Sequence, residues 1–368
     1  MKIYVIGSSI TSCYWNGAAT YYRGIYKNLH ELGYRITFAE PDIYKRQQNR
    51  DCSEIEYANV VIYQTPGGLE QVLADACNSD LIIKHSGVGA DDELLEHEVL
   101  NCASSRTRVA FWDVDAPATL ARVESDQRDP FRELIPKYDF IFTYGGGDPV
   151  VEDYAALGAR NCFPIYNALD SETHHPVAPQ EEFRCDLAFV GNRLPDREQR
   201  VEQFFLTAAE MASEFEFLLG GEGWGGKTLP KNVRWIGHVG TAHHNVINCS
   251  ARIVLNINRE SMARVGFSPP TRVFEAAGAA ACLITDAWTG VEIFFEVGRE
   301  ILVAKTAEDI VHLLRETSVG QAREIGAAMR QRALREHTYE LRAKQFDVIV
   351  RDTVAKSEMV GPLVDSVA

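Results

Sequence analysis

The residues best suited to chemistry lie between positions 267 and 286, in the segment FSPPTRVFEAAGAAACLITD. Pro269 and Pro270 favour a helix start, because the first N–H groups of a helix have no partner within it. The apolar run CLITD is typical of a strand that is covered on both faces. We therefore expect Glu275 in the second turn of a helix that begins at the carboxyl edge of a parallel sheet.

This arrangement suits a nucleotide. The Glu275 carboxylate can accept two hydrogen bonds from the hydroxyl pair of a ribose. The loop before it carries the N–H groups of Phe267, Ser268 and Thr271 close to a helix start, where an anion such as phosphate can bind. One short segment thus predicts both halves of a nucleotide-binding site.

A phosphate clamp is predicted at Asn192 and Arg193, which follow the strand-like run CDLAFVG. A turn after a strand places a guanidinium at the sheet edge, and that group can bind phosphate through two parallel hydrogen bonds. The structural alternative is a surface ion pair of Arg193 with Asp196 or Glu198.

A second cation could come from Arg259, which follows the buried strand predicted at VLNIN. Together with Arg193 it would balance the two charges of a diphosphate. The structural alternative is an ion pair with Glu260 or Glu275. For Arg272 an ion pair with Glu275, three residues along the same helix, is the expected role.

Three side chains in the first half could accept a proton from a hydroxyl group. Asp113 and Asp115 end the strand predicted at RVAFWDVD, and His85 ends the strand DLIIKHS. Asp115 could instead cap a helix that begins near Pro117, and His85 could be a strand-end histidine with partners inside the fold. No such local role is predicted for Asp113.

Two further patterns predict no site. The glycines between 220 and 226 lack the G-K-[ST] ending of a phosphate-binding Walker loop, so we expect a flexible loop there. His243 and His244 are adjacent, and adjacent residues do not share a helix face, which argues against a metal site.

The composition is that of a globular protein with 368 residues, 46% hydrophobic and 24% charged. At roughly 150 residues per domain, this length predicts two domains. The net charge of −15 argues against nucleic acid or an anionic membrane surface as the main partner, because both favour a basic face.

The chain is expected to be cytoplasmic. No apolar run approaches the roughly 20 residues that span a bilayer, and MKIYVIGSS resembles a first core strand more than a signal peptide. The eight cysteines are irregularly spaced without a C-x-x-C pattern, so we expect reduced thiols, mostly buried.

Strand-like and helix-like segments alternate along the chain, which predicts an α/β fold with parallel sheets. The polar stretch ALDSETHHPVAPQEEF breaks this alternation and is expected to link two domains. The predicted divisions are an N-terminal domain at 1–170, a C-terminal domain at 183–336, and a helix and tail at 337–368 that pack back on the first domain.

Several motifs resemble those of the spore-maturation-protein-like glycosyltransferase family. In the second half they are DLAFVGNRLPDREQRV, VRWIGHVGTAHHNVINCS, VLNINRESM and TRVFEAAG, and they occur in the order seen in that family. In the first half they are FWDVDAPATL, FTYGGGDPV and PIYNALDSETHHPV. The resemblance extends to about Tyr339, and TRVFEA followed by a CLITD-type strand is specific for the donor domain of GT-B glycosyltransferases.

The resemblance implies a GT-B fold, in which two Rossmann-like parallel-sheet domains face a cleft. The second domain would bind a nucleotide sugar, with Gly237 and His238 holding the nucleobase through backbone groups, and the first would bind a hydroxyl-bearing acceptor. No metal cofactor is expected, because arginines and helix dipoles can neutralise the leaving diphosphate. Asp113-Val-Asp115 has the letters of a metal-binding D-x-D motif, but it lies in the acceptor half.

One departure from the family pattern concerns stereochemistry. Retaining GT-B enzymes commonly carry a glutamate where this chain has Phe267. The sequence therefore assigns neither a retaining nor an inverting reaction, and it names no base, sugar, acceptor or oligomeric state. A GT-B epimerase or phosphorylase, and a non-catalytic sugar-binding or assembly protein with this fold, remain alternatives.

Overall fold

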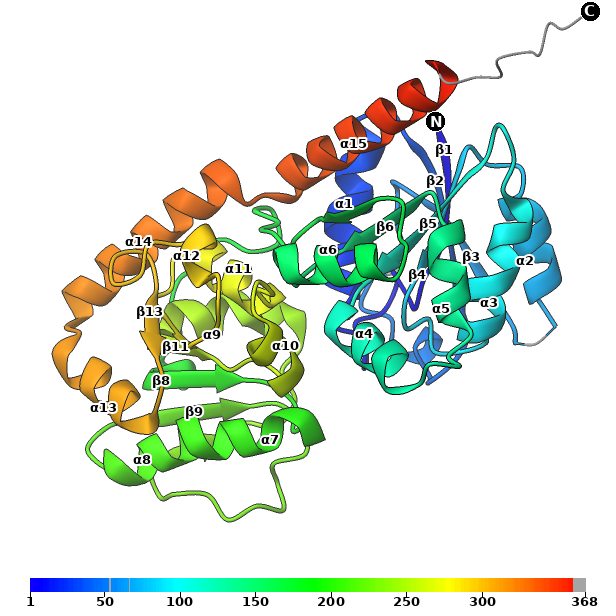
Figure 1. Cartoon of the computed structure of the whole chain (residues 1–368). Coiled ribbons are helices and arrows are strands. Elements are labelled where there is room, and N and C mark those ends of the chain that lie inside the picture. The colour runs from blue at the N-terminus through cyan, green and yellow to red at the C-terminus, as the bar shows by residue number, and fades with distance from the viewer. Residues whose placement is uncertain (53, 66, 360–368) are drawn as a thin grey trace, which may run out of the picture. The chain divides into compact units, whose positions relative to one another are not determined.

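The computed structural model describes residues 1–52, 54–65 and 67–359, which form two parallel sheets with helices packed on them (Figure 1). The seven-stranded sheet has the order β3-β2-β1-β4-β5-β6-β7, and the six-stranded sheet has the order β10-β9-β8-β11-β12-β13. The described pairings between neighbouring strands are all parallel. The predicted α/β fold with two parallel sheets is confirmed.

The strands of the first sheet are β1 (Lys2–Ile6), β2 (Arg35–Pro41), β3 (Asn59–Tyr63), β4 (Leu81–His85), β5 (Arg108–Asp113), β6 (Phe140–Thr143) and β7 (Cys162–Pro164). Those of the second are β8 (Cys185–Val190), β9 (Phe217–Gly220), β10 (Val233–Trp235), β11 (Ala251–Asn256), β12 (Leu283–Asp286) and β13 (Leu302–Ala304).

The helices of the first half are α1 (Ala19–Glu31), α2 (Leu69–Ala76), α3 (Asp92–Glu98), α4 (Ala116–Ser125), α5 (Phe131–Leu134) and α6 (Gly147–Ala156). Those that follow are α7 (Pro195–Val201), α8 (Thr207–Met211), α9 (His244–Ser250), α10 (Glu260–Val265), α11 (Thr271–Gly278), α12 (Val291–Phe294), α13 (Ala307–Glu316), α14 (Val319–Glu336) and α15 (Tyr339–Met359). A π-helical turn, Glu202–Leu206, joins α7 to α8. None of the helices in the described residues is both long and apolar enough to span a bilayer.

Contacts divide the chain into two compact units. One comprises Met1–Ala110 with the C-terminal part that begins at Tyr339, and the other comprises Phe111–Thr338. The domain boundaries at 170 and 183 stay a prediction.

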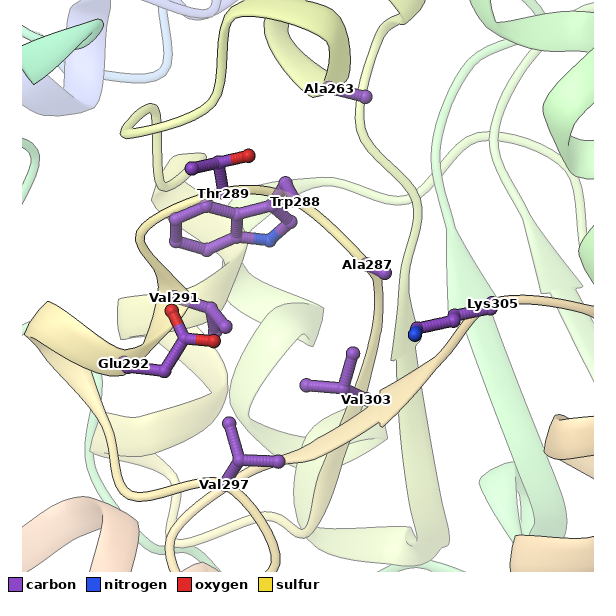
Figure 2. Close-up of a pocket in the computed structure, with 9 residues that line it drawn as sticks. All are labelled: Ala263, Ala287, Trp288, Thr289, Val291, Glu292, Val297, Val303 and Lys305. Atoms are coloured by element: carbon purple, nitrogen blue, oxygen red, sulfur yellow. The ribbon is translucent and has the colours of Figure 1, made fainter.

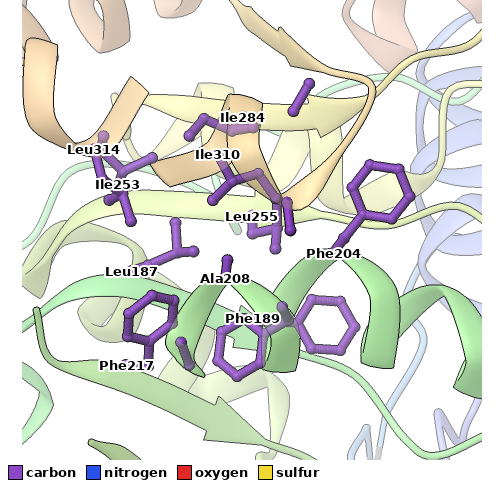
Figure 3. Close-up of a cluster of buried hydrophobic side chains, with 14 of the residues drawn as sticks. Leu187, Phe189, Phe204, Ala208, Phe217, Ile253, Leu255, Ile284, Ile310 and Leu314 are labelled. Atoms are coloured by element: carbon purple, nitrogen blue, oxygen red, sulfur yellow. The ribbon is translucent and has the colours of Figure 1, made fainter. Parts of the chain in front are cut away.

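The core beside the six-stranded sheet is formed by buried apolar side chains of its strands. Side chains of β8, β9, β11 and β12 pack against α8, α13 and the π-helical turn (Figure 3). The members labelled there are Leu187, Phe189, Phe204, Ala208, Phe217, Ile253, Leu255, Ile284, Ile310 and Leu314. Each large buried side chain contributes about 1.5–3 kcal/mol relative to exposure. This packing fixes the strand ends that carry the candidate site.

The last helix, α15, packs along α1 within the first unit (Figure 1). The contact is close at Gly24, where a Cβ atom would overlap the ring of Tyr339. The Tyr34 hydroxyl donates to Asp347 Oδ1 at 2.5 Å. A glycine in the middle of α1 is therefore explained by the approach of an aromatic ring.

Two cysteines are joined, which corrects the expectation of reduced thiols throughout. Cys77 and Cys102 form a disulfide with a Cα–Cα distance of 4.8 Å. Cys77 follows α2 and Cys102 ends a short 3₁₀ turn that packs on α2. Their proximity depends on tertiary packing, because 25 residues separate them in the chain.

Candidate functional site

Helix α11 begins directly after Pro269 and Pro270, as predicted, and carries Glu275 in its second turn. It comes close to the preceding chain at Gly278, where a Cβ atom would lie 2.5 Å from the carbonyl oxygen of His174. The side chain of Glu275 is buried, at 8% exposure. A buried carboxylate needs compensating partners, and the chain supplies them from two other segments.

Two histidines surround Glu275. His244, at the start of α9, places Nδ1 3.3 Å from Glu275 Oε2. His174 stacks its ring nearly parallel to that of His244, with centroids 6.4 Å apart. His174 is 3% exposed, and neither of its ring nitrogens has a hydrogen-bond partner among the described residues.

These neighbours keep Glu275 ionised. Burial by itself would raise the pKa of Glu275, but the contact with His244 and the charges of His244, His174 and Arg272 together hold that pKa well below its usual range. Sequence reasoning missed both histidines. His174 lies about a hundred residues before Glu275 in the predicted linker, and His244 was considered only as a metal ligand.

The loop before α11 is held in a strained conformation. Phe267 has a φ of +48°, in the left-handed region that few non-glycine residues adopt. Its N–H donates to the carbonyl of Thr289 at 2.7 Å, and its carbonyl accepts from the N–H of Gly146 at 2.9 Å. A Cβ atom on Gly147 would overlap the Phe267 ring. Strain of this kind persists only where the surroundings impose it, and it is concentrated at functional sites.

Ser268 and Thr271 follow in the same loop and helix start. Ser268 is 3% exposed, and its hydroxyl has no hydrogen-bond partner among the residues described. Thr271 is the first residue of α11, where backbone N–H groups have no partner within the helix. Of the predicted anion-binding donors, the N–H of Phe267 is therefore already engaged by Thr289, whereas the Ser268 hydroxyl is unpartnered in the described part of the chain.

Two arginines flank the ring of Phe189 at the end of β8. The guanidinium carbon of Arg197 lies 5.7 Å from the ring centroid, and that of Arg272 lies 5.5 Å from it. Burial, with a contribution from the charge of Arg272, lowers the pKa of Arg197 to about 10. Burial also lowers the pKa of Arg272. The lowered pKa values of Arg197 and Arg272 indicate that acidic groups of the fold compensate the positive charge of these two side chains only in part.

Arg272 corrects an expectation from the sequence. Within the described residues it makes no hydrogen bond or ion pair, so the predicted pair with Glu275 does not form, although the charge of Glu275 acts on it. Its guanidinium lies over the ring of Phe189 instead. Arg197 was not singled out in the sequence, since its helical surroundings gave no signal of burial.

Arg193 and Arg259 both have acidic partners. Arg193 Nη2 lies 2.6 Å from Glu198 Oε1, which is one of the predicted structural alternatives. Arg259 bonds Asp115 Oδ2 at 2.7 Å and also pairs with Asp196, instead of the predicted Glu260 or Glu275. Their phosphate-binding roles stay predictions.

The loop that carries Arg259 is fixed by a buried carboxylate. Asp286, at the end of β12, accepts hydrogen bonds from the N–H of Asn258 at 3.1 and 3.2 Å and pairs with Arg200 at 2.5 Å. The ends of β11 and β12 are thereby held together.

Asn192, Gly237 and His238 lie after β8 and β10. Asn192 Oδ1 accepts from the N–H of Glu222 at 3.0 Å. Gly237 has a φ of +73°, and its carbonyl accepts from Gly221 at 2.7 Å, while His238 is exposed. Their contacts with a nucleotide stay a prediction.

The glycine-rich segment between 220 and 226 is anchored, where a flexible loop was expected. Trp224 is fully buried, and its indole N–H donates to the carbonyl of Gly191 at 2.8 Å. The indole N–H of Trp235 donates to the carbonyl of Gly221 at 2.9 Å.

Asp113 has several local hydrogen-bond donors, and Asp115 does not cap α4, which is the reverse of what the sequence suggested for the two residues. Asp113 is fully buried and accepts hydrogen bonds from the N–H of Asp115 at 3.0 Å, the Thr119 hydroxyl at 3.1 Å and the Tyr154 hydroxyl at 2.5 Å. Asp115 is the residue before α4, but its side chain makes no capping bond. The expectation that Asp115 caps the helix and that Asp113 has no local role is therefore wrong.

The Asp115 side chain turns towards Arg259 instead and is 29% exposed. Burial raises the pKa of Asp115, although the charge of Arg259 opposes that rise and the charge of Asp113 adds to it. A small pocket of about 30 Å³ lies here, and its lining includes Asp115, Gly145, Arg259 and Ser268. The structure thus brings Asp115, Arg259 and Ser268 of the predicted site around one pocket.

His85 lies in the other unit, at the end of β4. It is fully buried, its Nε2 lies 2.5 Å from the Tyr26 hydroxyl, and its ring centroid is 4.4 Å from that of Tyr22. These contacts match the structural alternative for His85, and its role as a base stays a prediction.

A larger pocket, of about 570 Å³, opens beside the ends of β12 and β13. Figure 2 shows Trp288, Val297 and Val303 in its lining, with Glu292 and Lys305 on opposite sides. Thr289, which accepts the N–H of Phe267, also lines it, so the pocket borders the strained loop.

Comparison with known proteins gives one partial sequence match. Residues 197–347 match a family model described as glycosyl transferase-like. No curated protein sequence matches the chain.

Solved structures resemble the chain over nearly its whole length. Sucrose-phosphate synthase from Thermosynechococcus elongatus matches with a TM-score of 0.66 at 14% identity, over 97% of this chain and 100% of that one. HepE from Anabaena, solved with UDP and glucose, gives 0.65 at 12% identity, over 96% and 100%. An α-glucosyltransferase solved with UDP and DNA gives 0.66 at 10% identity, over 95% and 99%. The fold is that of the GT-B glycosyltransferases.

Proposed function

We propose that the chain is a glycosyltransferase that moves a sugar from a nucleotide-sugar donor to a hydroxyl-bearing acceptor without a metal cofactor. One observation carries the proposal. Within the described residues, helix α11 presents a buried, ionised Glu275 and, one turn away, an Arg272 without an ion pair, directly behind a strained loop in which the Ser268 hydroxyl has no partner. A nucleoside diphosphate has a diol and a dianionic linkage that match these two side chains.

In this proposal Glu275 accepts hydrogen bonds from the ribose hydroxyls. Arg272 and Arg197 face the diphosphate, where a guanidinium fork gives directed hydrogen bonds. The N–H groups at the start of α11 add partial positive charge. Since these groups act on the leaving diphosphate, no metal is required to neutralise it.

Asp115 is the proposed base for an inverting reaction. Its pKa is raised by burial, which suits a carboxylate that takes up a proton. The acceptor hydroxyl would lose its proton to Asp115, its oxygen would bond to the anomeric carbon, and the nucleoside diphosphate would leave with the bonding electrons. Asp113, hydrogen-bonded on both oxygens, would hold the Asp115 segment in place.

Support from relatives concerns donor and reaction class. HepE and the α-glucosyltransferase were solved with UDP, and the latter also with DNA. We infer that this chain uses a donor of the same chemical type. A nucleic-acid acceptor is disfavoured by the net charge of −15, and that exclusion is part of the proposal.

Calorimetric titration with a panel of nucleoside diphosphates tests the donor site. One of them should bind the parent chain, and Glu275→Ala should weaken that binding by about 1.5–3 kcal/mol, as expected when hydrogen bonds to a charged group are lost. Glu308→Ala, an exposed carboxylate on α13, should change nothing. Equal affinity in a folded Glu275→Ala protein would remove the ribose role, and release of nucleotide from a nucleotide sugar without any acceptor would indicate an epimerase.

A further inference from the structure

Exposed aromatic rings lie at the carboxyl edge of the first sheet. Trp15 is 57% exposed and Tyr44 is 61% exposed. Trp15 lies in the loop after β1, and Tyr44 lies in the loop after β2. Because β1 and β2 are parallel neighbours, the two loops leave the same edge of the sheet.

Both exposed aromatic residues have an unfavourable backbone conformation. Trp15 has a φ of +47° and Tyr44 has a φ of +53°, both in the left-handed region that bulky residues avoid. Lys45 and Asp91, in loops at the same edge, also have positive φ. Conformations of this kind are unfavourable and persist where the surroundings impose them.

One buried side chain ties the two aromatic residues together. Arg46 is 6% exposed, and its Nη2 donates to the carbonyl of Trp15 at 3.5 Å, while its guanidinium carbon lies 5.2 Å from the Tyr44 ring centroid. Arg46 Nη1 also donates to the carbonyl of Ser8 at 3.0 Å. The Tyr44 hydroxyl donates to the carbonyl of Gly89 at 3.1 Å.

A second buried group fixes the loop that carries Trp15. Glu40, fully buried at the end of β2, accepts hydrogen bonds from the N–H of Ile10, the hydroxyl of Thr11 and the amide of Gln47, at 2.5–2.6 Å. The loop that carries Trp15 is therefore held in place by hydrogen bonds to a buried carboxylate.

We propose that Trp15 and Tyr44 form a platform for a neutral carbohydrate acceptor. This assignment rests on the proposed glycosyltransferase function and names its acceptor class. A sugar ring has an apolar C–H face that packs on an aromatic ring, and hydroxyls that hydrogen-bond around it. The rings here stand among exposed polar side chains, namely Asp42, Lys45, Gln48 and Asn49.

The same surroundings argue against other occupants. A lipid chain or a stable protein partner needs a continuous apolar surface, whereas the residues exposed beside Tyr44 in its loop are polar and Trp15 contacts the ring of Tyr14 edge-on. Single-stranded nucleic acid also stacks on aromatic rings, but it requires a basic groove. Here the exposed Lys45 and Arg50 are balanced by the exposed Asp42 and Asp51 in the same segment, and the chain carries a net charge of −15.

The test is calorimetry of the full chain with neutral malto-, cello-, xylo- and chito-oligosaccharides, beside a single-stranded DNA oligonucleotide and neutral lipid vesicles. At least one oligosaccharide should bind. Trp15→Ala and Tyr44→Ala should each weaken that binding roughly ten-fold or more, as for an aromatic anchor. Trp15→Phe should stay close to the parent, and Leu94→Ala, an exposed apolar residue on α3, should have no effect.

Nucleoside diphosphate affinity, measured on the same proteins, separates this proposal from the proposed function. It should be unchanged in both platform variants, and a melting temperature near that of the parent shows that they are folded. Oligosaccharide binding that depends on Trp15, without nucleotide binding, would uphold the platform and remove the donor site. Binding of no oligosaccharide, equal binding by the alanine variants, or Trp15-dependent binding of DNA or vesicles alone would overturn the platform.

Discussion

Glu275 shows how a buried charge becomes part of a site. Its pKa is held low in the folded chain by His244, His174 and Arg272, against the effect of burial. The unfolded chain has a glutamate pKa of about 4.3, so below that pH it binds more protons than the folded chain does. Folding stability therefore rises with pH across this acidic window and is lost as pH falls through it.

This linkage gives a prediction for stability. The free energy of unfolding of the parent, measured with urea, should fall from about pH 5 downward, and Glu275→Gln should flatten that dependence while lowering stability near neutral pH. Glu31→Gln, at an exposed glutamate that ends α1, should leave the slope unchanged. A Glu275→Gln protein with the parental slope would show that the histidines do not stabilise the ionised carboxylate.

Arg272 should distinguish phosphate binding from support of the fold. Arg272→Lys removes the guanidinium fork while keeping a charge, so affinity for the nucleoside diphosphate should fall much more than affinity for the bare nucleoside. Arg299→Lys, on an exposed ion pair, serves as the matched control. Arg193→Lys tests the clamp predicted after β8 in the same way. Equal losses for both ligands would assign either arginine to the fold.

Asp113 and Asp115 should separate by their effects. Asp115→Asn should reduce the transfer rate by about 10²- to 10⁴-fold in an inverting enzyme, with donor affinity and melting temperature near those of the parent. Asp113→Ala should mainly lower the melting temperature, because it leaves Tyr154 and Thr119 without their acceptor. A normal rate in Asp115→Asn would place the base elsewhere or indicate a mechanism that uses none.

At the scale of elements, the contact between α1 and α15 gives a prediction about packing. Gly24→Ala places a methyl group in the Tyr339 ring, which should destabilise the chain by about 1–3 kcal/mol. Gly320→Ala, in the open first turn of α14, is the matched control and should be neutral or stabilising. Equal unfolding free energies for the two variants would show that α15 does not depend on this contact.

The elements were largely predictable from the sequence, because strands covered on both faces require apolar runs such as LII at 81–83 and CLI at 282–284. Prolines at 269 and 270 similarly located the start of α11. The partners of the charged residues were not predictable. Pairings such as His244 with Glu275, and Arg259 with Asp115, join segments that only tertiary packing brings together.

At the scale of the whole molecule, sequence similarity covers a shorter part of the chain than fold similarity does. The family model covers residues 197–347, whereas the solved structures resemble nearly all of it at 10–14% identity. The sequence similarity therefore includes the segment TRVFEA, on which the donor-site prediction rests. The loops after β1 and β2 carry no motif with defined chemistry, so the aromatic platform emerges only from exposure and backbone conformation.

Sugar transfer is tested most directly by mass spectrometry of oligosaccharide acceptors. These are incubated with the full chain and a panel of nucleotide sugars in the presence of a metal chelator. We predict that one acceptor gains the mass of one sugar residue while an equal amount of nucleoside diphosphate is released. Glu275→Ala and Arg272→Ala should strongly reduce the amounts of sugar product and of released nucleoside diphosphate. Binding of nucleotide sugars with no product for any acceptor class, or product only after a divalent metal is restored, would contradict this prediction.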